Sequence, residues 1–272
     1  MNFFELLRLT RPLNLLIVIF ATIVSFSITG TYTDFSLFLR FLTPLVLLAA
    51  YGNVLNDIMD SELDKRNHPE RPIPRGTVKI NDALYFSLFV FLMLIFSIFL
   101  VPSVKVRLYF FVGLILIFLY DIVLKKFLLI GNFVVSLLTA YPFVIVAVAF
   151  KKLDKLWYPV LCAILFNLVR EAVKNAQDFV HDAEFGYRTL PYFVGYKGVR
   201  VYSIALLILL VALSLVAFKG GFGGWVFLIY MIFLWCSAII AILRVKAFSK
   251  LSMLLKAFMI LILLGFLIGG KG

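Results

Sequence analysis

Long apolar stretches, separated by short polar ones, recur along the whole chain. Most of them approach the roughly 20 apolar residues that an α-helix needs to cross a bilayer. A helix is the expected structure for each, because backbone N–H and C=O groups in lipid must pair within the segment. The pattern therefore predicts an all-α fold, a polytopic membrane protein built as a bundle of nine transmembrane helices with polar cap loops. The predicted spans are 13–30, 36–56, 83–102, 107–120, 128–150, 157–178, 201–218, 223–243 and 252–269.

The first apolar stretch, 13–30, follows Arg8 and Arg11 and in this respect resembles a signal peptide. A small-residue cleavage site is not evident after it, so we expect a retained transmembrane helix. Apolar spans then continue to the end of the chain, with no second kind of region between them. We therefore expect one membrane domain over 1–272.

Composition supports this interpretation and narrows the function classes. Hydrophobic residues make up 64% of the chain, against about 45–50% in soluble domains. The formal net charge of +12 would suggest nucleic acid as a partner of a soluble protein, but no basic stripe is interleaved with exposed aromatic residues. Cys162 and Cys236 fall in apolar spans and predict no disulfide framework. Two histidines, His68 and His181, are too few for a histidine-based metal site.

Basic residues are concentrated on one side of the predicted bundle. The N-terminus and the loops near 57–82, 121–127, 179–200 and 244–251 hold most of the lysines and arginines. Positively charged loops stay in the cytoplasm, so we expect the N-terminus and these cap loops to be cytoplasmic in the cell membrane. Most acidic residues lie in or beside two of these loops, which makes them the candidate functional region.

A motif over 53–76 contains the first acidic cluster. Its polar side chains are spaced by four, three and four residues, which places them on one face of a helix. Like charges on one helix face repel each other, so this arrangement indicates a bound cation. A basic segment that begins at Arg71 follows. We call this row the first ladder; it consists of Asn53, Asp57, Asp60 and Asp64, with Asn56 beside it.

A second motif, over 170–191, repeats this arrangement. The same spacing of four, three and four residues begins just after Arg170 and includes Lys174 between its acids. A second basic segment begins at Arg188. Both ladders lie at the predicted cytoplasmic end of an apolar span. The second ladder consists of Glu171, Asn175, Asp178 and Asp182.

Two facing acidic helix ends suggest a site for divalent metal and phosphate. Mg²⁺ prefers one or two carboxylates, with waters and substrate phosphates completing its shell, whereas Zn²⁺ would require cysteine or histidine. Basic side chains beside the ladders would bind the diphosphate oxygens that the metal leaves free. The expected metal ligands are Asn56, Asp57, Asp60, Asp64, Asn175, Asp178 and Asp182, and the expected diphosphate-binding residues are Arg71, Lys125, Lys174, Arg170 and Tyr120.

Simpler explanations exist for several of these features. Lys65 and Lys174 would neutralise the carboxylates if no metal binds. Tyr120, at a helix end, suits an anchor at the membrane interface as well as a substrate contact. Gly52 and Gly131 suit close helix packing.

These motifs resemble the UbiA superfamily of intramembrane prenyltransferases over most of the chain. The first ladder with its basic tail is specific to that superfamily. The segment 67–76 is similar to the branch of ether-lipid and chlorophyll synthases, and Arg170 to Lys174 is more similar to the ether-lipid synthases. The resemblance rests on Arg11-Pro12-Leu-Asn14, Asn56-Asp57-x-x-Asp60-x-x-x-Asp64, Asn67-x-Pro69-x-Arg71-Pro72-Ile73-Pro74-x-Gly76, Tyr120-x-x-x-Leu124-Lys125-Lys126, Leu129-Ile130-Gly131-Asn132 and 170–191.

The resemblance implies a nine-helix fold with a cytoplasmic active site and an opening on the membrane side for apolar substrates. Two Asp-rich motifs would bind Mg²⁺ and the prenyl diphosphate. The chain departs from the ether-lipid synthases at Asn175 and Gln177, where they usually carry acids, and at His181, where they usually have glycine. These changes predict a lower affinity at the second metal and weaken the acceptor assignment.

The predicted activity is Mg²⁺-dependent transfer of a prenyl group, with geranylgeranyl as the expected chain, from a prenyl diphosphate to a lipid-soluble acceptor. Geranylgeranylglyceryl phosphate, in ether-lipid synthesis, is the expected acceptor, and an aromatic acceptor of the quinone or chlorophyll type is the alternative. Asp57 is the candidate general base. The expected catalytic residues are Asp57, Asp60, Asp64, Asp178 and Asp182.

Other function classes fit the same features less well. A cation-coupled transporter would also show paired acidic motifs and internal repetition, but ionisable residues in the middle of a span, expected on an ion path, are nearly absent. A lipid-binding scaffold without chemistry is a weaker alternative. The expected partners are the prenyl diphosphate, the lipid-soluble acceptor and membrane lipid, with no nucleic acid.

Overall fold

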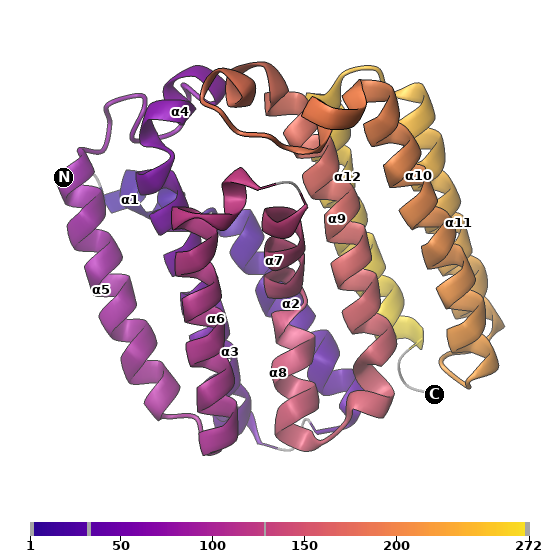
Figure 1. The fold of residues 1–272 in the computed structure, drawn as a ribbon. Helices are drawn as coiled ribbons and strands as arrows, with labels where there is room; N and C mark the ends of the chain where they lie inside the picture. Colours follow the sequence, from indigo (N-terminus) through magenta and orange to yellow (C-terminus); the bar gives the residue numbers. More distant parts are fainter. Residues whose placement is uncertain (1–2, 32–33, 128, 270–272) are drawn as a thin grey trace.

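The chain folds into a bundle of α-helices that stand side by side (Figure 1). The computed structural model describes residues 3–31, 34–127 and 129–269, and within them it contains no strand, which confirms the all-α prediction. The helices are α1 (Phe3–Leu9), α2 (Pro12–Thr29), α3 (Phe35–Met59), α4 (Ser61–Asn67), α5 (Ile80–Phe99), α6 (Val104–Ile122), the 3-10 turn η1 (Leu124–Lys126), α7 (Ile130–Thr139), α8 (Tyr141–Phe150), α9 (Leu153–Glu184), α10 (Leu190–Lys219), α11 (Trp225–Arg244) and α12 (Phe248–Gly269).

The predicted count of nine spans is not confirmed. Among the described residues, seven helices are long and apolar enough to cross a membrane, or eight if α7 and α8, which meet at 55°, form one broken span. The other predicted span corresponds to α6, which carries Lys105, Arg107 and Asp121 near its ends. Leu128, where the fifth span was predicted to begin, lies outside the described residues. The chain is a multi-pass membrane protein.

The long helix α9 is central to the packing of the bundle. It packs against α7, α8, α10 and α12, and α2 packs against α3, α8 and α12. At one end of the bundle the short helices α1 and α4 lie with the connection between α9 and α10 (Figure 1). Because α4 also packs against α9, the segments that carry the two ladders meet at this end.

The predicted loop 179–200 is much shorter than expected. Helix α9 continues to Glu184 and α10 begins at Leu190, so 185–189 is the remaining connection. The sequence pattern marked where the apolar stretch ends, but a helix keeps its own hydrogen bonds when it continues into polar surroundings. Within α10, Gly195 has φ 63° and ψ 179°, a backbone conformation essentially restricted to glycine, which kinks the helix.

The first ladder crosses a break between two helices, where a single helix was predicted. Helix α3 ends at Met59 and α4 begins at Ser61, with Asp60 between them at φ −94° and ψ 7°. Hydrogen bonds still run from the Asp60 N–H to the Asn56 carbonyl (2.9 Å) and from the Asp64 N–H to the Asp60 carbonyl (2.7 Å). The four-residue spacing therefore persists across the junction, and the two halves of the ladder belong to different helices.

A buried hydroxyl joins three helices inside the bundle. Ser214 of α10 lies 2.7 Å from the Tyr158 hydroxyl of α9 and accepts a hydrogen bond of 2.9 Å from the Trp235 indole N–H of α11. All three side chains are buried. Polar groups in hydrocarbon surroundings need such partners, so Ser214 holds α9, α10 and α11 in register.

We expect Ser214→Ala to lower the unfolding free energy in detergent by about 1–2 kcal/mol, because Tyr158 and Trp235 both lose a partner. Chemical or thermal unfolding followed by tryptophan fluorescence measures this change. Ser203→Ala is the matched control on the same helix, since Ser203 is buried and its hydroxyl has no hydrogen-bond partner in the described chain. Equal effects of the two substitutions would contradict the assigned role of Ser214.

Candidate active site

A cavity of about 700 Å³ lies inside the bundle, and its wall changes from polar to apolar with depth. Along α3 the lining residues run from Asp57 near the helix end to Leu45, about three turns away. Helices α2, α6, α7, α8, α9 and α12 complete the wall. The polar part is lined by Arg11, Asn56, Asp57, His68, Arg71, Tyr120, Asp121, Arg170, Glu171, Lys174 and Lys256, and the apolar part by Ile17, Val18, Leu45, Leu48, Ile117, Val135, Leu138 and Met259.

Two arginines compensate the buried carboxylates of the first ladder. Arg11 forms an ion pair with Asp57 and donates a hydrogen bond of 3.0 Å to the Asn56 side-chain oxygen. Arg71 forms an ion pair with Asp64 and lies 3.4 Å from Asp57. Asp57 and Asp64 are each only 3% exposed, so both guanidinium groups balance charge that water cannot reach.

Lys125 brings a cation to Asp60 from a different part of the chain. Its ammonium lies 2.5 Å from an Asp60 oxygen and 3.8 Å from Asp121. It is carried by the turn η1, which packs directly on α7 at Gly131. A Cβ at Gly131 would lie 2.9 Å from both the Leu124 carbonyl oxygen and the Lys125 Cα. This close approach confirms the packing role predicted for Gly131, and the packing sets the position of Lys125.

The second ladder meets the segment that follows the first. Asn67, at the end of α4, donates a hydrogen bond of 3.0 Å to Asp182, and its side-chain oxygen lies 2.8 Å from the His181 Nδ1 atom. His68 Nε2 lies 3.6 Å from Asp178. The structure therefore places the segment that follows the first ladder against the second ladder.

Tyr187, in the connection between α9 and α10, lies within electrostatic range of both ladders. Burial raises the pKa of its phenol to about 12, with further contributions from the carboxylates of Asp60 and Asp182. Sequence reasoning missed Tyr187; the available signal was its place between the second ladder and the basic segment that begins at Arg188. It also missed Asp121, which is buried at the end of α6 and accepts a hydrogen bond of 3.0 Å from Asn56.

The structure places the remaining predicted residues in two groups. Lys174, Arg170 and Tyr120 line the cavity, and for Tyr120 this position favours a substrate contact over a membrane-interface anchor. The Arg170 guanidinium lies 2.7 Å from Glu171. Asn175 instead donates a hydrogen bond of 3.0 Å to Asn132 of α7, so its amide links two helices.

The donor set fits Mg²⁺ by its chemistry. No group of three or more His, Cys, Asp or Glu side chains lies close enough to hold an ion by itself in the described ranges. Mg²⁺ does not require one, because it binds through one or two carboxylates and keeps waters or phosphates as its other ligands. Burial raises the pKa of Asp64 against the opposing effect of Arg71, and the charges of Asp60 and Asp57 raise it further. These crowded carboxylates would gain from a divalent cation.

Known proteins resemble this chain over nearly its whole length. A model described as the UbiA prenyltransferase family matches residues 16–267. The digeranylgeranylglyceryl phosphate synthase of Methanocaldococcus jannaschii is 31% identical over 97% of this chain and 95% of its own length. A solved structure from work on digeranylgeranylglyceryl phosphate synthase in membranes has a TM-score of 0.76 at 29% identity and covers 98% of both chains.

A more distant solved structure has the same fold. It is a UbiA homolog from Archaeoglobus fulgidus bound to GPP and Mg²⁺, with a TM-score of 0.69 at 15% identity over 94% of this chain and 98% of its own.

Cysteine cross-linking tests the meeting of the two ladders. The Asn67 and His181 side chains are in contact. The double variant Asn67→Cys with His181→Cys should therefore react in high yield with a short bifunctional thiol reagent. The background for this variant has alanine in place of Cys162 and Cys236. After the chain is cut between residues 67 and 181, the two fragments stay together on a denaturing gel only if they are cross-linked, so the fraction of uncleaved size measures the yield. Lys65→Cys with His181→Cys is the control, since residues two apart on a helix point to different sides. Equal yields for the two pairs would contradict the observed contact.

Proposed function

This chain belongs to the UbiA prenyltransferase family, and we propose that it transfers a geranylgeranyl group from its diphosphate to geranylgeranylglyceryl phosphate. The main observation that supports this proposal is a single cavity with buried carboxylates and cations at one end and apolar side chains at the other. A prenyl diphosphate has the same division, with a charged head and an apolar chain. The names of the relatives that cover nearly the whole chain support the ether-lipid acceptor over an aromatic one.

The carboxylates of the two ladders would hold the metal ions. Oxygen ligands suit Mg²⁺, and the Archaeoglobus fulgidus homolog contains Mg²⁺ with GPP. Asn175 is the weakest of the predicted ligands, because its amide is bound to Asn132. One or two carboxylates would hold each ion directly, drawn from Asp57, Asp60 and Asp64 with the amide of Asn56 for one ion, and from Asp178 and Asp182 with the amide of Asn175 for the other.

The cations beside the ladders would bind the diphosphate as it leaves. Arg71 and Lys125 already lie against ladder carboxylates, where diphosphate oxygens that the metals leave free would reach them. Lys174 and Tyr120 face the same cavity from α9 and α6. When bound, Mg²⁺ neutralises charge that develops on the diphosphate. These residues would add fixed positive charge and donors, which favours cleavage of the bond between the prenyl C1 and the diphosphate oxygen.

The acceptor hydroxyl oxygen would then form the new bond to C1 as the bond from C1 to the diphosphate breaks, and the released diphosphate could take up the hydroxyl proton. Asp57 is the base predicted from the sequence. Its carboxylate is already engaged by Arg11 and Arg71, so a positioning role for Asp57 is better supported.

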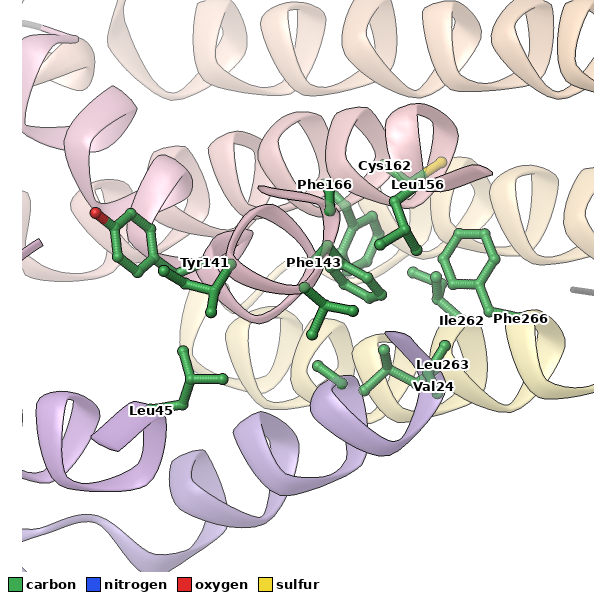
Figure 2. Close-up of a cluster of buried hydrophobic side chains, with 14 of the residues drawn as sticks. Val24, Leu45, Tyr141, Phe143, Leu156, Cys162, Phe166, Ile262, Leu263 and Phe266 are labelled. Atoms are coloured by element: carbon green, nitrogen blue, oxygen red, sulfur yellow. The ribbon is translucent and has the colours of Figure 1, made fainter. Parts of the chain in front are cut away.

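The apolar chain of the donor would extend towards a second, smaller cavity. This inner cavity, of about 40 Å³, shares Ile17, Ala21, Thr139 and Met259 with the wall of the main cavity. Its inner end is closed by buried side chains, which Figure 2 shows close together: Phe143, Cys162, Phe166, Ile262 and Phe266. The depth available to the prenyl chain is therefore set by this cluster.

The proposal includes the orientation of the protein and its organisation. The excess of lysines and arginines at the end of the bundle that carries α4 supports a cytoplasmic N-terminus and active site in the cell membrane. Asn67, just after the first ladder, donates a hydrogen bond to Asp182 of the second ladder, and this contact between opposite halves of the chain supports a single domain over 1–272.

Loss of ladder carboxylates should abolish the reaction while the protein stays folded. Asp60→Ala and Asp182→Ala should each lower turnover by about 10²- to 10³-fold in a mass-spectrometric assay with geranylgeranyl diphosphate, geranylgeranylglyceryl phosphate and Mg²⁺. Glu62→Ala is the matched control, because Glu62 lies beside Asp60 in the chain but is exposed and pairs with Lys65. Excess EDTA should remove wild-type activity, and full activity in EDTA would overturn the metal-dependent reaction.

Filling the inner cavity should shorten the accepted chain. We expect Cys162→Leu to lower kcat/KM for geranylgeranyl diphosphate about tenfold or more relative to geranyl diphosphate. Cys236→Leu is the control, since Cys236 is also within the bundle helices but exposed. The ratio of kcat/KM values for the two donors measures the effect, and a ratio unchanged by Cys162→Leu would place the end of the chain elsewhere.

A further inference from the structure

The cations that line the main cavity fall into two groups. Arg11 and Arg71 are each engaged by a carboxylate of the first ladder. On the wall formed by α9 and α12, Lys256 has neither a hydrogen bond nor an ion pair in the part of the chain that the structure describes. The Arg170 Nε atom is likewise buried without a partner among the described residues. This second group has unused capacity to donate hydrogen bonds to an anion.

The charge around Lys256 is positive. Lys256 is partly buried and lines the cavity, and its neighbours within electrostatic range include Arg170, Arg11 and Lys174. The carboxylate within range, Glu171, already contacts the Arg170 guanidinium at 2.7 Å. A partly buried ammonium with cationic neighbours is unfavourable unless an anion joins it, and such residues inside membrane proteins commonly mark a functional site.

One face of helix α12 is polar at one end and apolar at the other, as an amphiphilic ligand is. Ser249, Ser252, Lys256 and Met259 all line the cavity and follow each other at steps of three, four and three residues, which places them on one side of the helix. The same side continues into the inner cavity with Ile262 and Phe266. Hydroxyl groups, an ammonium and apolar side chains thus succeed one another along α12.

Apart from Glu171, which contacts the Arg170 guanidinium, the ladder carboxylates are separate from this wall. No ion pair joins α12 to a ladder residue within 3–31, 34–127 and 129–269. On α9, Arg170 lies one turn deeper than Lys174 and about two to three turns deeper than Asp178 and Asp182. An anion held by Lys256 and Arg170 would therefore lie deeper than one bound by metal at the ladders. Two anionic substrates that react together need such separated binding places, because their charges repel.

We propose that Lys256 and Arg170 bind the phosphate group of the acceptor, a glycerol-lipid phosphomonoester, while the ladder end binds the diphosphate of the donor. This inference rests on the proposed function, and it reassigns Arg170 from the donor diphosphate to the acceptor. The subsite selects acceptors by charge, so a neutral or aromatic acceptor without a phosphate binds poorly. The phosphate itself takes no part in the bond changes and serves to position the acceptor hydroxyl.

Steady-state kinetics with purified full-length protein test the assignment. Geranylgeranylglyceryl phosphate is compared with geranylgeranylglycerol, which lacks the phosphate, at saturating geranylgeranyl diphosphate and Mg²⁺, and the KM for the donor is measured at saturating geranylgeranylglyceryl phosphate. Lys256→Met should raise KM for the phosphorylated acceptor about 10- to 100-fold, remove the preference over the neutral acceptor, and leave KM for the donor unchanged. Lys256→Arg should retain most of the preference, because the charge and donors remain.

Lys250→Met is the matched control, since Lys250 lies on the same helix but is exposed and does not line the cavity. A rise in KM for the donor on Lys256→Met, or no preference of the wild type for the phosphorylated acceptor, would overturn the proposal. A measurement of acceptor binding in the absence of donor tests the phosphate subsite independently of the proposed reaction. Geranylgeranylglyceryl phosphate should raise the melting temperature of the wild type and of Lys250→Met but not of Lys256→Met, even if no acceptor is turned over; an equal rise in all three would refute the subsite.

Discussion

At one end of this helical bundle, the structure depends on ion pairs between buried carboxylates and basic side chains. Asp57, Asp64 and Asp121 are almost completely buried, and an isolated charge in such a place is strongly unfavourable. Each has a basic or amide partner that comes from elsewhere in the chain: Arg11 precedes α2, Arg71 follows α4, Lys125 lies in η1 and Asn56 lies on α3. The short elements at this end are thus held in place by the same charges that form the site.

The long helix α9 connects this polar end to the apolar interior. Its Tyr158 joins the Ser214 and Trp235 hydrogen-bond cluster, Cys162 and Phe166 close the inner cavity, and Asp178 and Asp182 reach the segment after α4. One continuous helix therefore links the depth of the cavity to the position of the charged groups. A substrate with a charged head and an apolar chain would be aligned along the same axis.

Two parts of the cavity wall differ in how their charges are satisfied. The cations near the first ladder are paired within the protein, whereas Lys256 on α12 has no such partner among the described residues. One cavity would therefore have two separate binding places for anions, one at the ladders and one at Lys256. This difference follows from the position of each cation relative to the carboxylates: in the described part of the chain, α12 contributes no carboxylate to the cavity lining, whereas α3 contributes Asp57.

Local features of the sequence were sufficient to predict the helical membrane fold and the two ladders. Apolar length and residue spacing are read within one segment, and a helix forms its hydrogen bonds within the same segment. The break at Asp60, the short connection at 185–189 and the pairings of Lys125 with Asp60 and Asn67 with Asp182 were decided by tertiary structure. These contacts join residues far apart in the chain, and spacing along one helix carries no information about the distance to another. For the same reason Asp121, Tyr187 and Lys256 acquired their significance only when the packing of the helices placed them beside the ladders or in the cavity.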